Sequence, residues 1–202
     1  DVFFVISGFL MTNIVVSGLG KGAFSFWRFM LARAQRIVPG LAFLCVALLA
    51  LGWFFLSAIE YEALARETAS SLGFVSNVLF WSQAAYFVTA AHDKCLLHTW
   101  SLSVEWQFYV AYPLAIMFLW RLKPGRTAVV SLLIYGALAS AAVCVISTPL
   151  RQTDAFYLLP ARAWEMLIGG LLYLYQDRIV LSGRMRRSIE AVGFGLIVGT
   201  VW

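Results

Sequence analysis

Long apolar runs separated by short polar segments dominate this sequence. Seven runs can be drawn, and most approach the ~20 residues that a helix needs to cross a membrane. They cover residues 2–19, 37–57, 72–91, 101–120, 127–147, 157–175 and 188–202. The pattern predicts an all-α fold, a polytopic transmembrane helical bundle, organised as one membrane domain over residues 1–202.

The composition supports this interpretation. Of the 202 residues, 62% are hydrophobic and 12% are charged, whereas about a quarter of a soluble domain is charged. The first run has no initiator Met or signal peptide before it, and the last run reaches Trp202. We therefore expect an internal piece of a longer protein, truncated at both ends. Three scattered cysteines without a CxxC pair argue against a disulfide framework.

The connecting segments differ in charge. Segments 20–36, 121–126 and 176–187 are basic, whereas segment 58–71 holds three glutamates and one arginine. Basic loops prefer the cytoplasmic side, so we expect the acidic segment to face outward. The net charge of +5 follows this topology and does not indicate nucleic-acid binding.

All three basic segments share one side only if residues 72–91 do not cross the membrane. A full crossing would put segment 121–126 outside and break the charge rule. The run also contains Ser76, Asn77, Ser82 and Gln83. We therefore predict a re-entrant or interfacial segment near 72–91, which would border an outer cavity.

Glu105 is the single charged residue in the run 101–120. A carboxylate in hydrocarbon costs several kcal/mol unless it is paired or hydrated. His98 precedes it by seven residues and lies on nearly the same helix face. The pair is a candidate for proton transfer; the alternative for Glu105 is a structural ion pair with Arg162.

Arg162 and Glu165 are three residues apart and can pair on one helix face. They form either the polar floor of a site or an ion pair that fixes helix register. The charge topology places them in the outer half of the membrane with Asp1, His98 and Glu105.

Arg33 and Arg36 share a helix face at the predicted inner surface. They either contact lipid phosphates or clamp an anionic cytoplasmic ligand, since guanidinium binds phosphate bidentately. Their spacing alone favours neither reading.

Other short motifs are weaker indications of function. The run from His92 to Cys95 and His98 has a zinc-like spacing but no second cluster, so no metal site is expected. Gly18–Gly22 lacks the spacing of a phosphate-binding loop. Ser7-Gly8 is typical of close helix packing rather than of a nucleophile elbow.

Four motifs, in this order and spacing, resemble the integral-membrane acyltransferase 3 family, which includes bacterial O-antigen acetylases. They are DVFFVISGFL at 1–10, RAQRIVP at 33–39, HTWSLSVEWQFY at 98–109 and FYLLPARAWE at 156–165. The resemblance covers nearly the whole chain, which would then be one acyltransferase 3-like domain.

The resemblance implies an enzyme of the bacterial inner membrane. It would move an acyl group from cytoplasmic acyl-CoA to a hydroxyl of an extracytoplasmic carbohydrate or glycolipid. The simplest donor would be acetyl-CoA. Arg33 and Arg36 would handle the donor, and Ser7, Gly8 and Phe9 match a further family motif. We expect Glu105, Arg162 and Glu165 to position the acceptor or orient the base, and His98 to contribute to the outer mouth.

Two departures from the family pattern limit these assignments. Many members have two acids where this chain has Glu105-Trp106. The family's essential histidine lies on a helix that would precede Asp1, so we do not expect His98 or Glu105 to be the base. A proton-coupled secondary transporter is the alternative function, although no inverted repeat supports it, and a non-catalytic membrane scaffold is a third.

Overall fold

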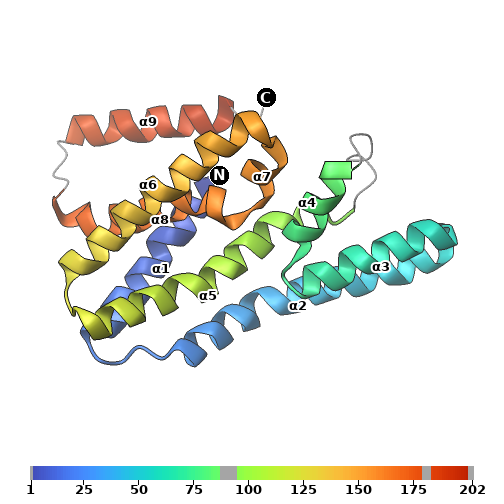
Figure 1. Ribbon diagram of the computed structural model, residues 1–202, viewed down its shortest axis with the longest axis horizontal. Helices are drawn as coiled ribbons and strands as arrows, with labels where there is room; N and C mark the ends of the chain where they lie inside the picture. Colours follow the sequence, from blue (N-terminus) through green and yellow to red (C-terminus); the bar gives the residue numbers. More distant parts are fainter. Residues whose placement is uncertain (1, 87–94, 179–182, 200–202) are drawn as a thin grey trace.

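The computed structural model describes residues 2–86, 95–178 and 183–199 (Figure 1). Every regular element within these ranges is helical, so the predicted all-α fold is confirmed. The helices are α1 (Val2–Gly20), α2 (Phe26–Phe55), α3 (Ala58–Leu72), α4 (Ser76–Tyr86), α5 (Thr99–Leu122), α6 (Arg126–Leu150), α7 (Gln152–Tyr157), α8 (Leu159–Tyr175) and α9 (Gly183–Gly199), with a 3-10 turn η1 at Gln176–Arg178.

Among the described helices, α1, α2, α5 and α6 are long and apolar enough to cross a membrane. Helix α2 is longer than the predicted run because it begins in the basic segment, at Phe26. The predicted run 157–175 is mostly α8, whose 17 residues span about 25 Å. Residues 200–202 of the last predicted run lie outside the described residues.

Segment 58–71, which we read as a connection, is helix α3. The side chain of Ser57 accepts a hydrogen bond from the backbone of Glu60, and the carboxylate of Glu60 accepts one from the backbone of Ser57. This capping box starts the helix. Its hydrogen bonds also hold the pKa of the exposed Glu60 below its usual value.

The predicted re-entrant run is interrupted by a turn between α3 and α4. Phe74 has a φ of 54° there, and α4 has 11 residues, about 16 Å or half of a membrane core. The described part of the run is therefore too short to cross the membrane as one helix. This agrees with a re-entrant or interfacial segment, which does not cross the membrane. Residues 87–91 of this run, like His92, lie outside the described residues.

The turn packs against α5 well inside that helix. The ring of Phe74 stacks on Trp106 at 4.2 Å, and the amide nitrogen of Gln107 donates to the Phe74 carbonyl at 3.1 Å. Nearby hydroxyls of α3, α4 and α5 bond to one another: Ser71, Ser76, Thr99 and Ser103. These bonds satisfy the polar groups that the turn brings into the bundle.

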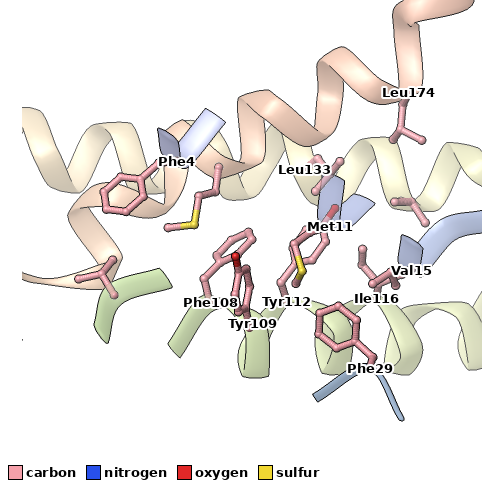
Figure 2. Close-up of a cluster of buried hydrophobic side chains, with 13 residues drawn as sticks. Phe4, Met11, Val15, Phe29, Phe108, Tyr109, Tyr112, Ile116, Leu133 and Leu174 are labelled. Atoms are coloured by element: carbon pink, nitrogen blue, oxygen red, sulfur yellow. The ribbon is translucent and has the colours of Figure 1, made fainter. Parts of the chain in front are cut away.

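Helices α1 and α8 cross in very close contact. A Cβ added to Gly8 would lie 1.8 Å from the Met166 carbonyl oxygen, and one on Gly169 would lie 2.0 Å from the Val5 carbonyl oxygen. The expected packing role of Gly8 is thereby confirmed. Figure 2 shows the adjoining apolar core, which joins α1, α2, α5, α6 and α8.

The basic segments gather at one end of the bundle. The α1–α2 and α5–α6 connections lie at the lower left of Figure 1 and the end of α8 lies above them on the left, whereas the acidic start of α3 lies at the far right. Arg126 and Arg178 line one pocket at the basic end. The predicted separation of basic and acidic segments is confirmed for these residues.

Candidate functional site

A pocket of about 470 Å³ lies between the second half of α1, the connection after it and the first half of α2. This volume is within the range of small-molecule sites. Its walls carry three arginines on a mostly apolar surface. The lining residues are Ile14, Gly18, Ala23, Phe24, Ser25, Arg28, Phe29, Ala32, Arg33 and Arg36. The pocket, called the arginine pocket below, suits a ligand with anionic groups and an apolar part.

Two aromatic rings hold Arg33 in the wall of this pocket. Its guanidinium carbon lies 5.2 Å from the ring centroid of Tyr109 and 5.6 Å from that of Phe29. The two rings meet edge to face, with centroids 6.3 Å apart. Such cation–π contacts restrain the guanidinium without neutralising its charge, so Arg33 stays available to an anion.

Tyr109 connects the arginine pocket to Glu105. The hydroxyl of Tyr109 and that of Ser7 both donate hydrogen bonds to the same carboxylate oxygen of Glu105. Glu105 is 1% exposed, and Arg33 and Arg36 interact with it electrostatically. Hydroxyl donors and nearby cations are what a buried carboxylate needs.

This arrangement changes our expectation for Glu105. We placed it with Arg162 and Glu165 in an outer site, but in the structure its hydrogen-bond partner Tyr109 also contacts Arg33. Its hydrogen bonds, among the described residues, go to Ser7 and Tyr109 and not to Arg162 or His98. The alternative of a Glu105–Arg162 ion pair is therefore wrong.

Arg162 and Glu165 form the predicted ion pair, with a nitrogen–oxygen distance of 2.8 Å. The guanidinium also lies over the rings of Phe156 and Trp100, at 5.2 and 5.7 Å from their centroids. Glu165 is 4% exposed. Its second carboxylate oxygen is buried and has no hydrogen-bond partner in the described part of the chain, which is uncommon for a buried polar atom.

His98 is exposed and immediately precedes α5, where its side chain does not cap the helix. Glu105, seven residues later, is buried against α1. The predicted proton-transfer pair is therefore not formed. Asp1, which we also expected near the outer surface, lies outside the described residues.

Ser7 and Tyr109 were missed as partners of Glu105. Tyr109 follows Glu105 by four residues on the same helix face, a spacing that could have identified it. Ser7 could not be found in this way, because its bond to Glu105 depends on how α1 meets α5.

The sequence was compared with known proteins. An acyltransferase domain, the one defined for the acyltransferase 3 family, matches residues 1–202. The chain is 31% identical, over its full length, to an uncharacterised protein of Haemophilus influenzae, of which it covers 83%. It is 33% identical, over 98% of its length, to the putative membrane-bound transacylase BcsY of Komagataeibacter xylinus.

A further relative is the O-acetyltransferase OatA of Staphylococcus aureus, 31% identical over 94% of this chain. The chain spans 50% of the length of BcsY and 32% of that of OatA. No solved structure matches it. Because the acyltransferase domain matches the whole chain and the relatives include a transacylase and an acetyltransferase, the protein belongs to the acyltransferase 3 family of membrane enzymes that transfer groups other than aminoacyl groups.

Proposed function

We propose that the protein is an O-acetyltransferase of the bacterial inner membrane. It moves an acetyl group from cytoplasmic acetyl-CoA to a hydroxyl of an extracytoplasmic cell-surface carbohydrate. The observation that carries the proposal is the arginine pocket, whose Arg33 is connected through Tyr109 to the buried carboxylate of Glu105.

The chemistry of the arginine pocket suits an acyl-CoA donor. Arg28, Arg33 and Arg36 can bind the phosphates, because guanidinium pairs with phosphate through two parallel hydrogen bonds. The apolar wall formed by Ile14 and Phe24 can pack against the less polar arm that carries the thioester. In this proposal the basic end of the bundle is cytoplasmic, in agreement with the positive-inside rule.

For the acceptor, we assign the neighbourhood of Arg162 and Glu165. The free oxygen of Glu165 can accept a hydrogen bond from a sugar hydroxyl, and the rings of Trp100 and Phe156 can pack against the apolar face of a sugar. The name of the relative OatA, an O-acetyltransferase, agrees with a hydroxyl as the accepting group. His98, at the exposed start of α5, would contribute to the mouth of this site.

The proposed reaction replaces a thioester by an oxygen ester. The acceptor oxygen attacks the acetyl carbonyl carbon, the carbon–sulfur bond breaks, and coenzyme A leaves as the thiol with the proton that the hydroxyl loses. Such a step requires a base and donors to the developing oxyanion. Glu105 accepts two hydrogen bonds and lies within electrostatic reach of two arginines, so we assign it the role of orienting groups around the donor rather than that of the base.

The test uses membranes that carry the full-length protein and acetyl-CoA labelled in the acetyl group. We expect label in surface glycan with the wild type, and about 10- to 100-fold less with Arg33→Ala, the loss expected when hydrogen bonds to a charged group are removed. The control is Arg66→Ala, since Arg66 is exposed and forms an ion pair with the exposed Glu62 on α3. Absence of label with the wild type, together with solute flux that Arg33→Ala abolishes, would indicate the transporter instead.

A further inference from the structure

We propose that Tyr109 is a positioning residue that couples the arginine pocket to Glu105, with its ring and its hydroxyl performing separate tasks. This inference rests on the proposed function, because it takes the ligand of the pocket to be the phosphate-bearing acyl donor. Tyr109 contacts both groups, since its ring lies beside the Arg33 guanidinium and its hydroxyl donates to Glu105.

The ring of Tyr109 positions Arg33. Its centroid is 5.2 Å from the guanidinium carbon, and the ring is itself fixed by packing in the core, with 3% of the residue exposed. A flexible arginine loses much conformational entropy when it binds an anion. Arg33 is already restrained by the ring, so it binds a phosphate with a smaller entropic cost.

The hydroxyl of Tyr109 positions Glu105. It donates to the same carboxylate oxygen as Ser7, and these two bonds fix the direction of the side chain. Glu105 also lies within electrostatic reach of Arg33 and Arg36. A ligand anion bound to those arginines therefore changes the electrostatic field at Glu105. Tyr109 holds Arg33 and Glu105 in fixed positions while the anion binds.

Tyr112 provides a matched control one helical turn further along α5. Its hydroxyl bonds to that of Thr12 on α1 at 2.5 Å, so it makes the same kind of α1–α5 contact as the group around Glu105. It is 4% exposed, nearly the same as Tyr109. It has no cation–π contact with Arg33 among those found in the described residues.

The experiment measures coenzyme A binding by calorimetry and the acetyl transfer rate at saturating acetyl-CoA, both on the purified full-length protein. Tyr109→Phe keeps the ring, so we expect a Kd for coenzyme A within about twofold of the wild type and a transfer rate about 10-fold lower. Tyr109→Leu removes the ring, and we expect the Kd to rise about 5-fold. Tyr112→Phe should leave both quantities within about twofold of the wild type. If Tyr109→Leu does not fold, Tyr109→Met replaces it, because the longer, unbranched Met side chain adapts better to an irregular space.

Three results would overturn the inference. One is an unchanged Kd when the ring is removed; another is equal weakening of binding by Tyr109→Phe and Tyr109→Leu. The third is equal slowing of transfer by Tyr109→Phe and Tyr112→Phe, which would indicate a general packing effect. If the wild type binds no coenzyme A, the proposed donor is wrong, and the Kd for inorganic pyrophosphate then decides the inference by the same dependence on the ring. Binding of neither probe would overturn both.

Discussion

The hydroxyl of Ser7 on α1 donates a hydrogen bond to the carboxylate of Glu105 on α5. The two residues are 98 positions apart and belong to different sequence motifs. Through Tyr109, the same carboxylate is connected to Arg33 of a third motif. Three of the four motifs that resemble the acyltransferase 3 family therefore meet around one buried acid.

Ser7→Ala should destabilise the protein and slow acetyl transfer. Removing one donor from a buried carboxylate costs about 1–3 kcal/mol, and Glu105 would be oriented by Tyr109 alone. The control is Ser17→Ala on the same helix, whose hydroxyl bonds to Tyr173 at 2.9 Å, whereas Glu105 is bonded to Ser7 and Tyr109. Thermal unfolding and labelled acetyl transfer check both variants, and equal transfer rates for the two would contradict the role of Ser7.

Gly8→Ala should prevent correct packing of α1 on α8. The added methyl would lie 1.8 Å from the Met166 carbonyl oxygen, which is backbone and cannot move aside cheaply. Gly20→Ala is the control, since nothing lies within 4 Å of the added Cβ. Size-exclusion profiles in detergent should show aggregation for Gly8→Ala alone, whereas two monodisperse variants would show that the crossing is looser than described.

Arg162→Ala should be strongly destabilising. It leaves Glu165 buried without its ion-pair partner, and breaking such a pair costs about 3–5 kcal/mol. Arg66→Ala breaks the exposed pair with Glu62, where both side chains are more than half exposed, and should cost less than about 1 kcal/mol. Chemical unfolding would measure both, and similar losses would argue that the Arg162 pair is solvated.

The topology predicts the side from which two cysteines can be labelled. In a background without Cys45, Cys95 and Cys144, Lys123→Cys should react with an impermeant reagent only from the cytoplasmic side, and Glu62→Cys only from outside. Both positions are exposed. Labelling of Lys123→Cys from outside would contradict the prediction that residues 72–91 do not cross the membrane completely.

Sequence patterns predicted the fold where periodicity and composition act locally. The runs that became α1, α5 and α6 were found because each is apolar over nearly its whole length. Helix α3 was not recognised, because four of its residues are charged. The capping-box spacing of Ser57 and Glu60 was the available indication.

The candidate site was predictable in its parts but not in its arrangement. The local spacing of Arg162 and Glu165 gave their ion pair correctly, because i and i+3 positions share a helix face. The predicted partners of Glu105 were wrong, because charge topology indicates the depth of a residue in the membrane and not the helix that it faces. Only the crossing of α1, α2 and α5 brings Ser7 and Arg33 to it.

The central claim is that an acyl-CoA donor bound by the arginine pocket, at the cytoplasmic side, supplies the acyl group. The most direct measurement compares inside-out and right-side-out membrane vesicles, each carrying the full-length protein and supplied with labelled acetyl-CoA. We predict labelled carbohydrate only in inside-out vesicles, with the label lost in Arg33→Ala and Arg36→Ala. Equal labelling in both orientations, or labelling that both arginine variants retain, would contradict the account.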